Sequence, residues 1–293
     1  MFTKKGFIWY TLMLMVCAWR AAFRPFILKG IEMEQSVIYY EDELNDEFSP
    51  GGITPRRIDA SYKYEGTVFR PLLRAVLYHI VAKILAFLYT KLVWGHKIVG
   101  RKKFKTVKDT AFFVYGNHTN QIGDPLVPSM MNFFGSTYVI VHPDNVSIPY
   151  LGRITPALGA IPLPDDKDAF RNYRKYLDLL VKKKRMIAIY PEAHIWPYYT
   201  HIRPFRAESF HYPVSYGVPS FCFTNTYHKR RFRKKPRMIT RIEGPFYPDT
   251  SLKRNEAIKD LRDRIYAAMD ENTKYNDIEI IRYIKKTEKA NEE

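Results

Sequence analysis

From Gly100 onward, short apolar runs alternate with stretches of helical periodicity, and this alternation limits the chain to few folds. The candidate strands are residues 111–115, 137–142, 160–163, 186–190, 219–225 and 237–243. The candidate helices are residues 125–134, 166–184, 206–216 and 252–270. Strands that alternate with helices form a mostly parallel sheet, because each helix carries the chain back to the start of the next strand. We therefore predict an α/β domain over residues 100–293, with a central, mostly parallel sheet flanked by helices.

The first 99 residues carry two apolar segments that differ from this pattern. Residues 7–19 are uncharged and mostly apolar, and basic residues flank them on both sides. A bilayer-spanning helix needs ~20 such residues, so an interfacial or re-entrant anchor is favoured, with a core helix as the alternative. Residues 68–94 carry apolar residues three or four positions apart, with basic residues spread between them. This predicts a long amphipathic helix that lies against a membrane or against the domain.

An acidic stretch separates the two apolar segments. Residues 30–55 hold seven Asp or Glu residues and no Lys or Arg. We predict a loop here, in which residues 37–40 could pair as an edge strand. Together these segments predict that residues 1–99 form a membrane-associating helical region, with an acidic loop at residues 30–55, in front of the α/β domain.

The chain carries a net charge of +17 although residues 30–55 are acidic, so the remainder is strongly basic. Such a charge predicts a polyanionic partner: an anionic membrane, a phosphorylated substrate or a nucleic acid. The densest part is Lys229–Arg241, with eight Lys or Arg residues and no acid. It can serve as an anionic-lipid patch, a solvated hairpin, or a nucleic-acid-binding segment in which Tyr227 and Phe232 stack on bases. No recognition-helix, zinc-finger or aromatic RNA-binding signature accompanies it, so no nucleic-acid partner is expected.

One stretch places a histidine and a carboxylate just past the end of a predicted strand. Residues 111–115 are apolar, Gly116 breaks the run, and His118 and Asp124 follow. Open α/β sheets bind ligands at the carboxyl ends of their strands. A neutral imidazole can take a proton from a hydroxyl near neutral pH, and a carboxylate on its other nitrogen fixes the tautomer. The alternative is that Asp124 only caps the helix expected at residues 125–134, beside a histidine that hydrogen-bonds the loop.

A second carboxylate is expected at the same edge of the sheet. Glu192 comes directly after the strand at residues 186–190, as His118 follows its own strand. No catalytic metal is expected, because the other histidines do not form a closely spaced motif of two histidines and a carboxylate. These histidines are His194, His201, His211 and His228.

The order and spacing of these motifs resemble the glycerophospholipid acyltransferase superfamily, which includes glycerol-3-phosphate and lysophosphatidic acid acyltransferases. The family's Asn-His…Asp motif resembles Asn117, His118 and Asp124, with five residues between His and Asp where the family usually has four. The other motifs, within roughly residues 100–245, are similar to residues 149–162, 190–194, 205–210 and 218–221. The arginines usual in the family's second and third motifs are absent, and the nearest cations are Lys167, Arg203 and Arg206.

This resemblance implies an O-acyltransferase that moves a fatty acyl group from acyl-CoA or an acyl carrier protein to the hydroxyl of a lysophospholipid or glycerol-3-phosphate-like acceptor. His118 would be the general base and Asp124 would orient it, without a covalent enzyme intermediate. Backbone N–H groups near residues 161–163 would form an oxyanion hole. The acceptor and its phosphate would be held by Glu192, Arg203, Arg206 and Lys167.

The resemblance also implies membrane lipids as partners, a membrane-associated location with the active site on the cytoplasmic side, and no cofactor beyond the donor substrate. The two cysteines, Cys17 and Cys222, lie far apart in sequence, which suits a reducing cytoplasm. Lys229–Arg241 gains a further interpretation as a site for the phosphates of CoA. The acceptor headgroup, the acyl chain and the oligomeric state stay open. The rival interpretation is a protein of the same fold that has lost the chemistry and acts at a membrane surface or on nucleic acid.

Overall fold

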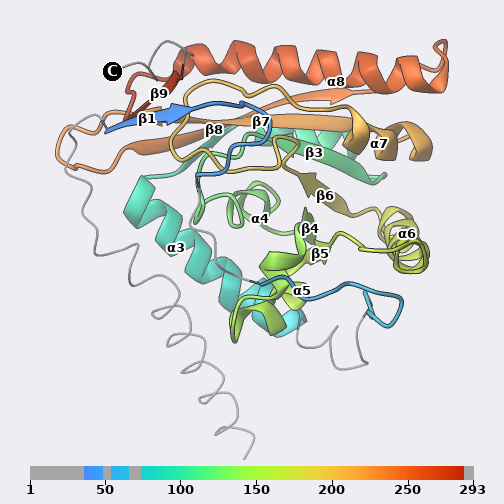
Figure 1. Ribbon diagram of the computed structural model, residues 1–293. Helices are drawn as coiled ribbons and strands as arrows, with labels where there is room; N and C mark the ends of the chain where they lie inside the picture. The colour runs from blue at the N-terminus through green and yellow to red at the C-terminus, as the bar shows by residue number, and fades with distance from the viewer. Residues whose placement is uncertain (1–35, 49–53, 66–73, 287–293) are drawn as a thin grey trace, which may run out of the picture.

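The computed structural model describes residues 36–48, 54–65 and 74–286. These residues form a seven-stranded sheet, a separate two-stranded sheet, and helices on both faces of the larger sheet (Figure 1). The apolar segment predicted at residues 7–19 lies outside the described residues, as do residues 68–73 of the long predicted helix.

The larger sheet is mostly parallel. Its strands are β2 (Lys97–Val99), β3 (Phe112–Gly116), β4 (Thr137–Val141), β5 (Ala160–Pro162), β6 (Met186–Ile189), β7 (Ser220–His228) and β8 (Arg237–Phe246). Their order is β2-β8-β7-β3-β6-β4-β5. Strands β3 to β7 run parallel to one another, β8 returns antiparallel to β7, and β2 runs parallel to β8. The predicted α/β fold is therefore confirmed, and the six predicted strands are present with small shifts at their ends.

Alternate residues of the central strand β3 face two separate cores, as the two-residue period of a strand requires. Phe113 and Tyr115 pack in the core that contains α6 (Lys167–Lys182) and α8 (Arg254–Glu271). Phe112 and Val114 pack in the core that contains α4 (Val127–Met131) and the end of α3 (Lys83–Trp94). Figure 1 shows α8 on one side of the sheet and α3 and α4 on the other. Because both faces are covered, β3 is a continuous apolar run rather than an alternating one.

Two of the predicted helices are shorter than expected. The helix predicted at residues 125–134 is the five-residue α4, because a turn occupies the residues before Val127. The helix predicted at residues 206–216 begins as a 3₁₀ turn and becomes helical only in α7 (His211–Tyr216). The short α5 (Thr155–Leu158) precedes β5. Periodicity did not predict it, but it lies within the motif at residues 149–162, where the family resemblance implies a helix between a turn and a strand.

The long helix predicted at residues 68–94 is present over its described part, Arg74–Trp94, and contains a π-helical stretch at Leu77–Ala82. It is long and apolar enough to cross a membrane by length and composition, and 28% of its apolar window is buried. One side packs on the domain through Tyr78, Ala86 and Trp94. The opposite side exposes residues spaced by four positions, which we call the apolar stripe: Ile80 (57% exposed), Ile84 (50%), Leu88 (47%) and Leu92 (62%).

The two-stranded sheet joins the two ends of the described chain. The predicted strand at residues 37–40 is confirmed as β1 (Ser36–Tyr40), and it pairs in parallel with β9 (Ile281–Lys285). β9 and β2 were not predicted, because three to five residues of mixed polarity carry no clear period. The division of the chain at residue 100 stays a prediction, although β1 and β2 both pair with strands from the later part.

Candidate active site

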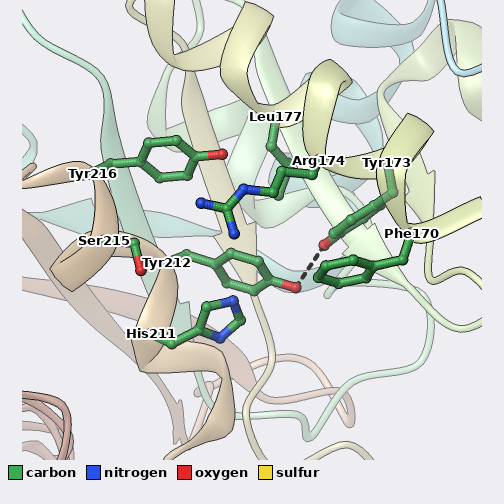
Figure 2. A pocket seen from close by; sticks show the side chains of 8 residues that line it. All are labelled: Phe170, Tyr173, Arg174, Leu177, His211, Tyr212, Ser215 and Tyr216. Atoms are coloured by element: carbon green, nitrogen blue, oxygen red, sulfur yellow. Dashed lines mark hydrogen bonds between the residues drawn. The ribbon is translucent and has the colours of Figure 1, made fainter. Parts of the chain in front are cut away.

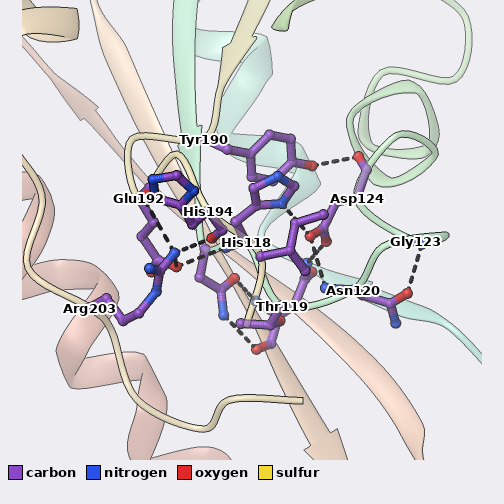
Figure 3. Close-up of polar contacts among 12 residues, drawn as sticks. His118, Thr119, Asn120, Gly123, Asp124, Tyr190, Glu192, His194 and Arg203 are labelled. Carbon is purple, nitrogen blue, oxygen red and sulfur yellow. Dashed lines mark hydrogen bonds and ion pairs between the residues drawn. The ribbon is translucent and has the colours of Figure 1, made fainter. Parts of the chain in front are cut away.

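His118 and Asp124 form a hydrogen-bonded pair at the carboxyl end of β3. His118 Nδ1 lies 2.7 Å from Asp124 Oδ2 (Figure 3). The Asp124 side chain is fully buried, and that of His118 is 17% exposed. With Nδ1–H donating to the carboxylate, the lone pair resides on Nε2, which has no hydrogen-bond partner among the described residues. A partly exposed, neutral imidazole in this tautomer is suited to accept a proton.

A tight turn absorbs the extra residue between His118 and Asp124. The Asn120 backbone N–H donates to Asp124 Oδ2 (2.9 Å), and Asn120 Oδ1 accepts from the backbone N–H of Gly123 (2.8 Å). Because the chain is still turning here, the N-cap of α4 is Leu126 and not Asp124. The interpretation of Asp124 as a helix cap is therefore wrong, since its carboxylate is directed to His118.

Gly123 brings the end of α3 against this turn. A Cβ atom at Gly123 would lie 2.8 Å from the Trp94 ring and 2.9 Å from the Asn120 side chain, so only glycine fits without displacing one of them. The helix that carries the apolar stripe thus ends in contact with the loop that carries the histidine.

The second oxygen of Asp124 is held from β7 and β8. Asn225 Nδ2 donates to Asp124 Oδ1 (3.3 Å), Thr240 Oγ1 donates to Asn225 Oδ1 (2.6 Å), and Thr240 Oγ1 lies 2.8 Å from His96 Nε2. Sequence reasoning missed these three residues. The available signal was an asparagine inside an apolar strand, because a buried polar side chain requires a hydrogen-bond partner.

Tyr190 fixes the plane of the imidazole. Its ring stacks on that of His118, with centroids 4.6 Å apart and 23° between the planes. Its hydroxyl donates to the backbone carbonyl of Asp124 at 2.5 Å. Burial raises the pKa of Tyr190, so this hydroxyl keeps its proton and stays a donor.

Glu192 lies beside His118 as predicted, because β6 and β3 are neighbouring parallel strands. Glu192 Oε2 accepts the backbone N–H of His118 at 3.2 Å, and the residue is only 3% exposed. Burial raises the pKa of Glu192, while the positive charge of Arg203 acts in the opposite direction. Glu192 therefore contacts His118 through the backbone N–H of that histidine.

Arg203 is enclosed by the protein. Its side chain has no exposed surface. Nη2 lies 3.5 Å from Glu192 Oε2 and also donates to the carbonyls of Glu192 and His194, while Nη1 donates to the carbonyl of Glu43 (3.2 Å). The guanidinium also lies over the Trp196 ring, 4.9 Å from its centroid. In this arrangement Arg203 neutralises Glu192 and offers no exposed N–H to a bound phosphate.

The other predicted acceptor-binding cations are exposed. Arg206 lies in the segment between β6 and β7. Lys167 is the first residue of α6, after β5, and two strands separate β5 from β3. Adjacent strands are ~4.8 Å apart, so β5 lies about 14 Å from the strand that carries His118. The structure therefore places Glu192 and Arg203 beside the histidine, whereas Lys167 has no hydrogen bond or ion pair with a site residue among the described residues.

The prediction of an oxyanion hole near residues 161–163 is wrong. The backbone N–H of Leu163 donates to the carbonyl of Val141 (3.0 Å), and Pro162 has no N–H. Ile161 is paired with β4 in the sheet. These groups complete the pairing of two strands and are not available to a substrate.

The acidic segment after β1 covers the loop that follows Glu192. Glu47 Oε2 lies 3.1 Å from His194 Nδ1, and the Trp196 indole N–H donates to the carbonyl of Asp46 (2.8 Å). The Trp196 ring is fully buried and packs on Tyr40 and Tyr283 of the two-stranded sheet. This sheet and its acidic loop therefore hold the loop that positions Glu192 and Arg203.

A pocket between α6 and α7 lies apart from these residues (Figure 2). Its wall includes the hydrogen-bonded hydroxyls of Tyr173 and Tyr212, 2.9 Å apart, and the side chain of Arg174. None of the predicted site residues lines it. Among the described residues, no group of three His, Cys, Asp or Glu side chains could hold a metal ion.

Comparison with known proteins gives a likeness in structure alone. No protein-family model matches the sequence, and no curated protein matches it. Among solved structures, the chain is similar to the crystal structure of the 1-acyl-sn-glycerophosphate (LPA) acyltransferase PlsC from Thermotoga maritima, with 18% sequence identity and a TM-score of 0.48. The match covers 73% of this chain and 86% of that one.

Proposed function

We propose that this protein is an O-acyltransferase that moves a fatty acyl group from a thioester donor, acyl-CoA or an acyl carrier protein, to the hydroxyl of a lysophospholipid or glycerol-3-phosphate-like acceptor. The observation that carries the proposal is the pair of His118 and Asp124. A fully buried carboxylate 2.7 Å from Nδ1 leaves Nε2 of a partly exposed imidazole to act as a base. The order of motifs along the sequence favours the hydroxyl of a lipid acceptor and the thioester carbonyl of the donor as the groups that meet there.

The reaction needs one proton carrier and no covalent intermediate on the protein. His118 Nε2 takes the proton of the acceptor hydroxyl as its oxygen attacks the thioester carbonyl, and Asp124 stabilises the imidazolium that forms. The tetrahedral intermediate then collapses with cleavage of the C–S bond, and the leaving thiolate takes the proton from Nε2. The products are an ester and a free thiol, and His118 returns to its neutral form.

The apolar stripe supports a membrane location for this chemistry. Ile84 and Leu92 are each at least half exposed, and an apolar helix face of this length favours contact with lipid. Both substrates carry acyl chains that reside in a bilayer. Since Trp94 contacts the turn at Gly123, docking of this helix on a membrane would bring the His118 loop close to the lipid headgroups.

A non-catalytic protein of the same fold that acts at a membrane surface is the second candidate. The observation that favours it is the burial of Arg203, which leaves the phosphate of an acceptor without the cation nearest to Glu192. It predicts membrane binding without thiol release.

The test is release of free thiol from palmitoyl-CoA by the purified full chain in liposomes. The acceptor panel consists of glycerol-3-phosphate, lysophosphatidic acid, zwitterionic lysolipids and a glycolipid. We expect turnover with one acceptor class, its loss in His118→Ala, and its retention in the control His211→Ala, which alters a histidine of the pocket between α6 and α7. Full activity of His118→Ala would contradict the mechanism. If no acceptor gives thiol release, with palmitoyl-CoA or with an acyl carrier protein donor, the second candidate is favoured.

A further inference from the structure

The loop that joins β7 to β8 is densely basic. We call Lys229–Arg237 the basic hairpin. It holds seven Lys or Arg residues and no acid. Among the described residues, no carboxylate lies within ion-pair distance of any of these cations. Asp277 is at its base, where it pairs with His228 (3.0 Å) and accepts the backbone N–H of Lys229. The cationic side chains thus keep an uncompensated charge that a partner could neutralise.

Two of these cations attach the basic hairpin to the end of the apolar stripe. Arg230 Nη1 donates to the carbonyl of Val93 (2.8 Å), and Arg233 Nη1 donates to the carbonyl of Leu92 (2.9 Å). Carbonyls in the last turn of a helix lack partners within the helix, so these arginines cap α3. A shallow hollow between the two elements is lined by Leu92, Val93, Arg233, Lys234 and Lys235.

Apolar side chains are exposed next to this charge. Phe232, at the tip of the basic hairpin, is 86% exposed, and Leu92 at the end of the stripe is 62% exposed. Exposed aromatic and aliphatic side chains beside Lys and Arg are typical of surfaces that enter the boundary between lipid headgroups and acyl chains. A soluble anion would account for the cations but not for the exposed apolar residues.

The basic hairpin also lies at the edge of the sheet where His118 is found. β7 runs parallel to β3 and pairs Phe223 with Gly116. It then continues to His228 before the hairpin begins, so the hairpin extends beyond the carboxyl end of β3.

We propose that the basic hairpin and the C-terminal end of α3 form one surface that binds anionic phospholipid headgroups, with Phe232 and Leu92 inserted among the acyl chains. This extends the proposed function by naming the lipid charge that orients the His118 edge toward the bilayer, but the binding itself requires no acyl transfer.

The test compares two variants that lose the same charge. Arg231→Gln/Lys234→Gln/Lys235→Gln removes exposed cations of the hairpin and keeps the two capping arginines. Lys182→Gln/Lys183→Gln/Lys184→Gln removes three exposed cations at the end of α6, before the amino end of β6. Partition of each full chain is titrated with phosphatidylcholine vesicles and with vesicles in which part of that lipid is phosphatidylglycerol.

We expect wild type and the α6 variant to bind the anionic vesicles more tightly than the zwitterionic ones. The hairpin variant should bind the anionic vesicles roughly 100-fold more weakly than wild type, because each cation near an anionic surface contributes about fivefold. Phe232→Ser should weaken binding to both kinds of vesicle, since it removes inserted apolar surface. Equal losses in the hairpin and α6 variants would overturn the proposal, because net charge alone would then explain the binding.

The same hairpin variant distinguishes anionic lipid from other anionic ligands. If the hairpin variant keeps its affinity for anionic vesicles but loses that for CoA or for a single-stranded RNA, the surface is a donor or nucleic-acid site and the proposal is wrong. His118→Ala separates this proposal from the acyltransferase one. This variant should bind vesicles as wild type does. If no thiol is released but vesicle binding still depends on the hairpin, the acyltransferase proposal is wrong and the lipid-binding proposal stands.

Discussion

Asn225 donates a side-chain hydrogen bond to Asp124 Oδ1 at 3.3 Å and so joins β7 to the carboxylate that orients His118. Asn225→Ala removes this donor and leaves Oδ1 of a buried carboxylate without it. We expect kcat to fall by roughly tenfold, with little change in KM and a shifted acid limb of the pH–rate profile, because Asp124 would hold the imidazole that acts as the base less firmly.

Thr224→Val is the matched control for Asn225→Ala. It alters a buried polar residue of the same strand, whose hydroxyl donates to the carbonyl of Met269 in α8 and not to the site. The pH–rate profile of this variant should match wild type. If both variants lower kcat equally without moving the profile, Asn225 supports only the strand.

Asp124→Asn should strongly lower activity and increase stability at neutral pH. Burial raises the pKa of Asp124, with the hydrogen bond from His118 acting in the opposite direction. A carboxyl whose pKa is raised by folding stabilises the fold in its neutral form, and this contribution is lost as the pH rises through the folded pKa. Asparagine has no such dependence. The difference in unfolding free energy between variant and wild type should therefore grow in favour of the variant from acid to neutral pH.

Urea unfolding of both proteins across that pH range measures this difference, and thiol release measures activity, which should fall by roughly 100-fold or more. A variant that is inactive but less stable than wild type at neutral pH would show instead that the ionised Asp124 carboxylate stabilises the folded protein.

Glu192→Gln should destabilise the protein, because it leaves the buried Arg203 guanidinium without a neutralising charge. Breaking a buried ion pair costs about 3–5 kcal/mol, whereas an exposed pair contributes about 0–1 kcal/mol. The half-exposed pair of Arg264 and Asp260, whose side chains are 38% and 32% exposed, supplies the control Asp260→Asn. The double variant Glu192→Gln/Arg203→Met should recover part of the loss, as a double-mutant cycle would measure.

The same variant separates two roles of Glu192 in catalysis. The glutamine oxygen can still accept the backbone N–H of His118, so a role limited to that contact predicts an unchanged kcat and KM. A role in binding the acceptor through the carboxylate charge predicts a raised KM.

His96 should make the fold sensitive to mild acid. Burial lowers the pKa of His96 from 6.5 to about 4. The unfolded chain therefore takes up a proton first as the pH falls, and stability present above pH 6.5 is lost progressively toward pH 4. The loss amounts to about 3 kcal/mol at most. His96→Gln should unfold with a flatter pH dependence over this window, and an unchanged dependence would assign the acid sensitivity to other groups.

Much of the architecture follows from local pattern. The apolar run at residues 111–115, the capped helix α6 and the Pro-Glu pair at the end of β6 each depend on near neighbours in sequence, and each was predicted. The placement of His118 and Glu192 on one edge followed from strand direction alone, since the carboxyl ends of parallel strands meet. Short elements such as β2 have no periodic pattern of apolar residues and could not be predicted from the sequence.

The amino-acid order alone thus established the fold class, the strand ends that carry polar residues, and the long amphipathic helix, because periodicity and turn chemistry act over a few residues. The folded structure decided which partner each buried polar group takes. Asp124 faces His118 instead of capping α4, Asn225 reaches Asp124 across 101 positions of sequence, and Arg203 is enclosed instead of facing a substrate. Such contacts depend on burial and on strand order, which place residues together that no local pattern relates.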